Sequence, residues 1–111
     1  MILKVVFSPE AYNDLEKTKA YLTNEFGLKT SNTNIKKVIK SIRSLERFPF
    51  KGPGVWERYG IESDYRYLYT NHNYVFYRVD NECVKIIRIL DARCDFLNIL
   101  FGIKTQTDDI N

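Results

Sequence analysis

The chain has 111 residues, of which 44% are hydrophobic and 28% charged, a composition typical of a soluble globular domain. This length predicts one hydrophobic core and excludes a second domain of ordinary size. No apolar run approaches the roughly 20 residues that a membrane-spanning helix needs, and the N-terminus has no secretory signal, so we expect a cytoplasmic protein. The net charge is +3, with thirteen basic and eight acidic side chains in residues 35–104, which mildly favours an anionic partner.

The beginning of the chain predicts a strand followed by a helix. Residues 2–7 form a short apolar run, which is typical of a buried strand. Ser8 is a good N-cap, and Pro9 suits the first position of a helix. Apolar residues then recur every three or four positions and predict a helix over residues 9–26.

A second helix is predicted after a short polar linker at residues 28–34. Apolar residues recur beyond it with the clearest helical period in the chain: Ile35, Val38, Ile39, Ile42 and Leu45. This helix is expected to end before Pro49, and its apolar face to pack on the first helix and on strands. Its opposite face is basic; such a face is most often solvated, but it could also be a binding surface.

The second half of the chain has the period of two residues that is typical of strands. The segment 48–54 contains two prolines and two glycines and is predicted to be a loop, and the strand pattern begins at Val55. Three strands separated by short turns predict an antiparallel meander at residues 65–69, 74–79 and 83–90.

The last predicted element is a short C-terminal helix or apolar plug at residues 96–102. We expect a single domain over residues 1–104, with a frayed tail at 105–111. The predicted fold class is α+β, with an N-terminal strand and a helical hairpin packed on an antiparallel β-sheet.

Several kinds of chemistry have no support in the sequence. The spacing of the two cysteines, Cys83 and Cys94, fits no zinc pattern, so both are predicted to be reduced thiols. The single histidine, His72, lies between two asparagines in a predicted turn and is expected to be exposed and without a catalytic role. There is no glycine-rich phosphate loop, nucleophile elbow or metal-ligand cluster, so neither a cofactor nor a metal is expected.

Basic and aromatic side chains are interleaved along the predicted strands. An arginine offers a fixed fork of donors to phosphate or carboxylate, and a tyrosine ring can stack on a base. The candidate residues are Arg58, Tyr65, Arg66, Tyr74, Tyr77, Arg78, Arg88 and Arg93, with Asp91 and Asp95 beside the last. Equally, most of them could form cross-strand pairs and core rings, and Arg93 with Asp95 could be a local ion pair.

Three segments that span nearly the whole chain carry a family resemblance. In order, they read VVFSPEAYNDLEKTKAYL, IKSIRSLERFPFKGPG and YVFYRVDNECVKIIRILDARCDF. They resemble the RelE/ParE superfamily of toxins from bacterial type II toxin–antitoxin systems, also called plasmid stabilisation proteins. The resemblance implies a compact α+β fold and a cognate antitoxin, part of which orders on contact as it covers the sheet or active groove of the toxin.

The superfamily has two functional branches. RelE-like members cleave messenger RNA on the ribosome, and ParE-like members poison DNA gyrase. The FYRVD and RILxxRxD patterns are closer to the ParE-like branch, which implies a growth-inhibiting toxin that binds gyrase without catalysis. In this interpretation the residues that contact the target or the antitoxin are Arg58, Tyr65, Tyr74, Tyr77 and Asp95.

Asp91 departs from the family pattern, because many ParE-like sequences carry histidine at this position. A carboxylate there would weaken the affinity of Arg93 for phosphate.

Two alternative functions stay open. In a RelE-like ribosome-dependent endoribonuclease, four arginines would hold the scissile phosphate while Tyr65 or Tyr77 stacks on a base; they are Arg66, Arg78, Arg88 and Arg93. A non-toxic, degenerate member of the superfamily would serve as a binding module.

Overall fold

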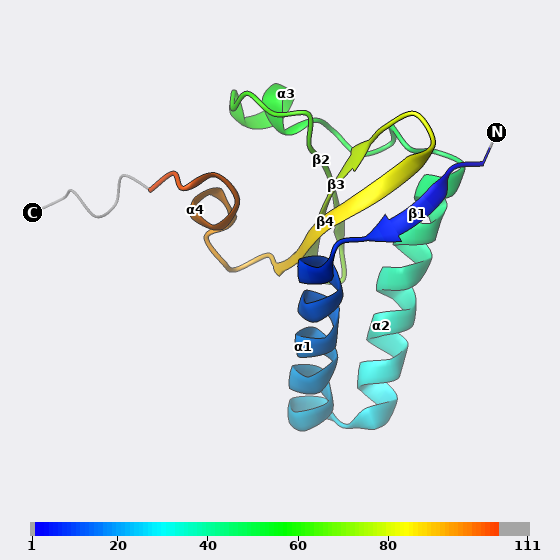
Figure 1. Cartoon of the computed structure of the whole chain (residues 1–111). Helices are drawn as coiled ribbons and strands as arrows, with labels where there is room; N and C mark the ends of the chain where they lie inside the picture. The colour runs from blue at the N-terminus through cyan, green and yellow to red at the C-terminus, as the bar shows by residue number, and fades with distance from the viewer. Residues whose placement is uncertain (1, 105–111) are drawn as a thin grey trace, which may run out of the picture.

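The computed structural model describes residues 2–104 (Figure 1). Its elements in chain order are β1 (Lys4–Phe7), α1 (Pro9–Phe26), α2 (Leu28–Arg43), the 3-10 helix η1 (Ser44–Glu46), α3 (Val55–Tyr59), β2 (Arg66–Thr70), β3 (Asn73–Val79), β4 (Cys83–Asp91) and α4 (Phe96–Phe101). The tail that was predicted to fray, 105–111, lies outside the described residues. None of the helices in the described part of the chain is long and apolar enough to cross a membrane.

The four strands form one sheet in the order β1-β4-β3-β2. The predicted meander is confirmed, because β2 pairs with β3 and β3 with β4 in antiparallel register. β1 joins the outer side of β4 in parallel register, from Lys4 opposite Cys83 to Phe7 opposite Ile86. The sheet is therefore mixed, and the predicted α+β class is confirmed.

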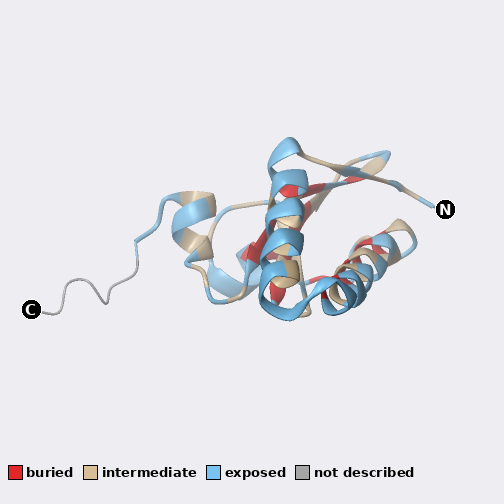
Figure 2. Cartoon of the chain, turned by 90° about the horizontal axis from the view of Figure 1, so that it is seen from below, coloured by how far each residue is buried: buried red, intermediate tan, exposed pale blue. Residues whose placement is uncertain are grey.

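The helical hairpin of α1 and α2 packs on one face of the sheet (Figure 1). Buried positions lie on the inner sides of these helices and in the strands beneath them, while the outer sides are exposed (Figure 2). The core between the two layers consists of Ala11, Val38, Ile42, Leu45, Val75, Tyr77, Val84, Ile86 and Ile89. Burying each large apolar side chain contributes about 1.5–3 kcal/mol, so this layer is the main source of stability.

The opposite face of the sheet carries an aromatic cluster. The ring of Phe96, the first residue of α4, lies 5.2 Å from the rings of Tyr74 and Phe76 on β3. Val55 of α3 and Leu90 of β4 are buried in the same cluster. The predicted C-terminal helix therefore exists, and ring contacts hold it against the sheet.

The predicted linker at residues 28–34 is wrong, because α2 begins at Leu28. Gly27 alone reverses the chain between the two helices, with a φ of +91° that suits glycine. Ser31 is fully buried at the start of α2 and donates a hydrogen bond of 3.1 Å to the Lys19 carbonyl of α1. Packing against α1 thus outweighs the weak helix propensity of the Thr, Ser and Asn residues in this segment.

The start of the strand region at Val55 was also predicted wrongly, since residues 55–59 form the short helix α3. Val55 is fully buried, and the Gly54 N–H donates to Glu57 Oε1 over 3.3 Å, which caps the first turn. Gly60 ends the helix with a φ of +69°. Five residues are too few for a helical period to become visible in the sequence.

α1 also closes the edge of β4 where the short strand β1 ends. Ser8 N donates to the Ile86 carbonyl over 2.9 Å, and Ser8 Oγ donates to the Ile87 carbonyl over 2.8 Å. Further along the strand, Asp14 Oδ2 accepts the Ile89 N–H at 2.9 Å. Side chains of the α1 N-terminus thus satisfy backbone groups that would otherwise lack a strand partner.

Candidate functional site

Residues 91–93, which belong to the RILxxRxD pattern, lie at the end of β4 beside the β2–β3 turn. Arg93 Nε and Nη2 each donate to a different carboxylate oxygen of Asp91 at 3.0 Å, and the Arg93 backbone N–H donates to Oδ1 at 2.8 Å. These hydrogen bonds hold the pKa of the Asp91 carboxyl below its usual value and raise the pKa of the Arg93 guanidinium. The Arg93 side chain keeps 79% of its surface exposed, so it remains accessible to a partner.

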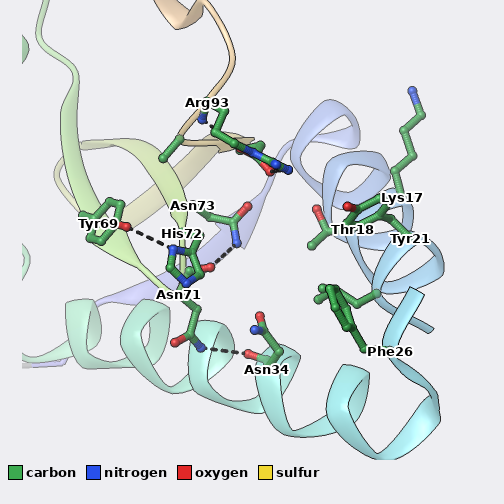
Figure 3. A pocket seen from close by; sticks show the side chains of 13 residues that line it. Lys17, Thr18, Tyr21, Phe26, Asn34, Tyr69, Asn71, His72, Asn73 and Arg93 are labelled. Carbon is green, nitrogen blue, oxygen red and sulfur yellow. Dashed lines mark hydrogen bonds and ion pairs between the residues drawn. The ribbon is translucent and has the colours of Figure 1, made fainter. Parts of the chain in front are cut away.

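A cleft of about 650 Å³ lies next to this ion pair (Figure 3). It is lined by Lys17, Thr18, Tyr21, Leu22 and Phe26 of α1, Asn34 of α2, and Tyr69, Asn71, His72, Asn73, Asp91, Ala92 and Arg93 of the sheet and its turns. One wall is therefore mainly apolar and aromatic, and the other presents amides, an imidazole and a guanidinium. This combination suits an amphipathic segment with an acidic or hydrogen-bonding edge.

The turn between β2 and β3 forms the polar wall of the cleft. Asn71 and His72 both have positive φ angles, 48° and 65°, as the two central residues of a type I′ hairpin turn do. Asn71 Nδ2 donates to the Asn34 carbonyl over 3.2 Å and so ties the turn to α2. His72 Nδ1 lies 3.4 Å from the Tyr69 hydroxyl, and the exposed imidazole faces the cleft.

Three cleft residues from α1, namely Lys17, Tyr21 and Phe26, were missed in the sequence. Lys17 and Tyr21 lie off the buried stripe that marks the predicted helix, and Phe26, four residues after Leu22, extends this stripe past the core. Tyr21 is 49% exposed and Phe26 is 60% exposed. Large aromatic side chains outside the core stripe of a well-defined helix were the signal that could have found this wall.

The four arginines considered for phosphate binding do not converge on one point. Arg78, near one end of β3, pairs with Lys85, whereas Asn73 at the other end pairs with Asp91, just before Arg93. A strand rises about 3.3 Å per residue, so the backbones of Arg78 and Asn73 are about 17 Å apart.

Apart from Arg93, each of these arginines has partners of its own in the fold. Arg66 Nη1 donates to the Gly52 carbonyl over 2.7 Å, and its guanidinium lies 4.9 Å from the centre of the Phe50 ring. Arg88 forms a two-bond pair with Asp14 of α1, at 2.7 and 3.0 Å. Arg78 Nε lies 3.8 Å from Asp64 Oδ2. These contacts organise the fold at separate places.

Tyr77 does not fit its predicted role as a partner-binding residue, because its side chain is fully buried under the hairpin. Its hydroxyl accepts the Gly52 N–H at 3.1 Å, and burial raises the pKa of the phenol. A Cβ atom at Gly52 would lie 2.8 Å from this hydroxyl. Tyr77 therefore fixes the loop after η1 to the sheet.

The remaining predicted residues lie around α3 and α4. Tyr65 and Tyr74 are partly buried, with ring centres 5.9 Å from Phe101 and 5.2 Å from Phe96 respectively. Asp95 caps α4 and accepts the Asn98 N–H at 3.4 Å. Arg58 of α3 is exposed. The structure thus gives three of these residues a role in holding α4, and leaves Arg58 accessible.

Within residues 2–104, no group of three or more His, Cys, Asp or Glu side chains is placed to hold a metal ion. The cleft offers one exposed imidazole and one carboxylate that is already paired with Arg93. Its chemistry suits binding through rings, amides and cations.

Comparison with known families identifies the family of the chain. A family model described as the ParE toxin of type II toxin–antitoxin systems (parDE) matches residues 5–96. The chain belongs to the ParE toxin family. The matched range contains every candidate site residue of the sequence analysis, from Arg58 to Asp95, and confirms the ParE-like resemblance.

The fold is also similar to that of a solved ParE-family system. A chain from the structure titled "Chromosomal ParDE TA system from P. aeruginosa" superposes with a TM-score of 0.68 at 16% sequence identity, over 81% of this chain and 96% of that chain. At this identity the likeness shows a shared fold. A search of curated proteins found no match.

Proposed function

We propose that this ParE-family chain is a growth-arresting toxin that acts in the cytoplasm by binding DNA gyrase and is neutralised by a cognate antitoxin. The observation that carries the proposal is the family match over residues 5–96. The dispersed arginines add support, because a nuclease that used all four would need them around one phosphate. A toxin that acts by binding needs only an accessible surface.

The cleft beside Arg93 is the surface that we assign to a protein partner. Its aromatic wall on α1 offers burial to apolar side chains, and the Arg93 guanidinium offers a two-bond contact to a carboxylate if Asp91 releases it. Arg58 on α3 is the second accessible cation of the predicted set. Tyr65, Tyr74 and Asp95 would act indirectly in this proposal, by holding α4 in place.

The primary test is pulse labelling of DNA and protein synthesis in cells immediately after the chain is induced without an antitoxin. We expect DNA synthesis to fail first and gyrase-linked DNA breaks to accumulate. Immediate loss of protein synthesis, with cuts in translated messages, would overturn the proposal in favour of the endoribonuclease. Normal growth at a high soluble level of the chain would instead indicate a non-toxic binding module.

A matched pair of variants tests the role of Arg93. Arg93→Ala removes an exposed ion-pair member at the cleft end of the sheet, and Lys85→Ala removes one at the other end of β4, where Lys85 pairs with Asp80 at 3.5 Å. We expect Arg93→Ala to require at least ten times as much inducer as the unaltered chain to arrest growth. Lys85→Ala should require the same inducer concentration as the unaltered chain. Equal arrest by both variants at equal soluble level would remove Arg93 from the site.

A further inference from the structure

The outer face of α2 is strongly basic and lies apart from the cleft end that carries Arg93. The sixteen residues Leu28–Arg43 contain no acidic side chain and five basic ones: Lys29, Lys36, Lys37, Lys40 and Arg43. All five are exposed. Val38 and Ile42 are buried against the sheet, and the outer side of the helix, to which the five basic residues belong, is exposed (Figure 2). We call these five side chains the basic face.

The charge of the basic face is almost entirely uncompensated within the described part of the chain. Arg43 pairs with Glu46 over 3.6 Å, and its own side chain is 69% exposed. The four lysines have no ion-pair partner among residues 2–104. Such a concentration of one charge sign repels itself, which makes it costly unless an anion binds there.

Small hydrogen-bonding side chains lie beside the lysines. Lys29 and Lys37 line a hollow of about 300 Å³ together with Thr30, Thr33, Asn34 and Asn71. Hydroxyl and amide groups of this kind, set among cations, are the usual partners of phosphate oxygens in protein–DNA complexes.

The dimensions and chemistry of the basic face fit a nucleic-acid backbone. A helix rises about 1.5 Å per residue, so Lys29 and Arg43 lie about 21 Å apart along α2, roughly six base-pair steps of duplex DNA. α2 exposes no large apolar side chain except Leu28 at its first residue. An acidic protein segment would need apolar anchors to bind here stably, whereas a phosphate backbone needs only charge and hydrogen-bond donors.

We propose that the basic face of α2 binds the phosphate backbone of duplex DNA without reading its sequence. This inference goes beyond the proposed action on gyrase, since a gyrase-binding toxin requires no DNA contact of its own. The proposal can be tested on the purified toxin without gyrase, so it can fail while the gyrase proposal stands.

The test measures binding of the full chain to a fluorescent 30-base-pair duplex between 50 and 200 mM salt. Four to five phosphate contacts predict that log K falls with log[salt] with a slope of about −4, a loss of roughly 250-fold over this range. Lys36→Gln/Lys40→Gln should reduce the magnitude of the slope by about 2 and weaken binding at least tenfold at 50 mM salt. Duplexes of unrelated sequence should bind equally.

Lys4→Gln/Lys104→Gln serves as the control with the same change in net charge. Lys4 is exposed on β1, where Val5 and Phe7 face the helices, so alternation along the strand directs Lys4 to the opposite face of the sheet. Lys104 follows α4 and is also exposed. We expect this variant to bind DNA like the unaltered chain, and neither double variant to have a lower thermal unfolding midpoint than the unaltered chain.

Three outcomes would overturn the proposal. One is absence of duplex binding by the unaltered chain at 50 mM salt. Another is equal weakening in the two double variants, which would indicate an effect of net charge alone. The third is tighter binding of a polyglutamate peptide than of the duplex at equal salt, which would assign the basic face to an acidic protein segment.

Discussion

Arg88 on β4 and Arg93, five residues later, each pair with an aspartate. The two pairs differ in the sequence separation of their members and in their exposure to solvent. Arg88 pairs with Asp14, which lies 74 residues away in the sequence, and the two side chains are only 28% and 11% exposed. Arg93 pairs with Asp91, two residues away, and these side chains are 79% and 45% exposed. The first pair joins a helix to the sheet, while the second lies on the rim of the cleft.

The difference shows that the burial and the neighbouring contacts of an ion pair decide whether it stabilises the fold or is available to a partner. Hydrogen bonds with aspartate raise the pKa of both guanidinium groups, so protonation does not distinguish them. Asp14 also accepts the Ile89 N–H, and a replacement must therefore satisfy a backbone group as well as a charge. We infer that the Arg88 pair stabilises the fold and that the Arg93 pair can be opened by a partner at little cost.

The largest expected effect comes from Asp14→Ala. It leaves the Arg88 guanidinium and the Ile89 N–H without their partner, and should lower the free energy of unfolding by about 2–3 kcal/mol in urea denaturation. Glu16→Ala is the control, since Glu16 is an exposed carboxylate on the same helix, and it should change stability by less than about 0.5 kcal/mol.

A double variant sharpens this prediction. If an unpaired Arg88 is the main cost, Asp14→Ala/Arg88→Met should be more stable than Asp14→Ala alone, because no uncompensated charge remains. If the loss of stability in the double variant equals the sum of the losses in Asp14→Ala and Arg88→Met, the two residues are not coupled. That result would contradict the structural role that we assign to the Arg88 pair.

Arg88→Lys should have an intermediate effect. A lysine keeps the charge but has no planar fork, so it cannot reproduce both bonds to Asp14 at 2.7 and 3.0 Å. We expect a loss of about 1 kcal/mol in the free energy of unfolding. Stability equal to that of the unaltered chain would mean that the second bond contributes nothing.

Arg93→Ala should leave the free energy of unfolding nearly unchanged, because exposed local ion pairs contribute little. The measurement is urea denaturation at pH 7, alongside the growth assay in which the same variant is expected to lose activity. A stability loss as large as that of Asp14→Ala would mean that the Arg93–Asp91 pair also stabilises the fold.

The smallest effect is a dependence of stability on pH at Asp91. Its pKa is lowered in the folded chain, so the pair stabilises the fold above the ordinary aspartate pKa of about 3.9 and loses this contribution as the pH falls through the lowered value. The unaltered chain should exceed Asp91→Asn in unfolding midpoint by a small, constant amount from pH 5 to 7. The difference should disappear toward pH 2, and persistence of the difference there would argue against this pair as its source.

Much of the fold followed from local patterns in the sequence. Ser8 and Pro9 marked the start of α1, and Ser8 Oγ accepts the Ala11 N–H at 2.9 Å as an N-cap should. The three predicted strands of the meander lie within one residue of β2, β3 and β4. Capping and alternation are recognisable because each depends on residues that are close together in the chain.

The site was less accessible to sequence reasoning. Arg93 was correctly placed at the end of a strand, but its companions in the cleft come from α1, α2 and the β2–β3 turn. The sequence predicts an exposed His72 in a turn, which the structure confirms, but not that this turn lines the cleft; it also predicts that Tyr77 contacts a partner, whereas Tyr77 is buried. Which face of a strand a tyrosine occupies depends on register and on the bulge near Phe76, which the alternation alone did not reveal.

The sequence by itself determined the α+β class, the order of most elements and the ParE-like family, because these depend on local periodicity and on motifs within single segments. Only the tertiary structure decided that β1 runs parallel to β4, that residues 28–34 are helical, and that Arg88 is bound to Asp14 whereas Arg93 is exposed. The physical reason is that burial and long-range pairing depend on which surfaces meet. Two arginines only five residues apart in the sequence can therefore have different roles in the folded chain.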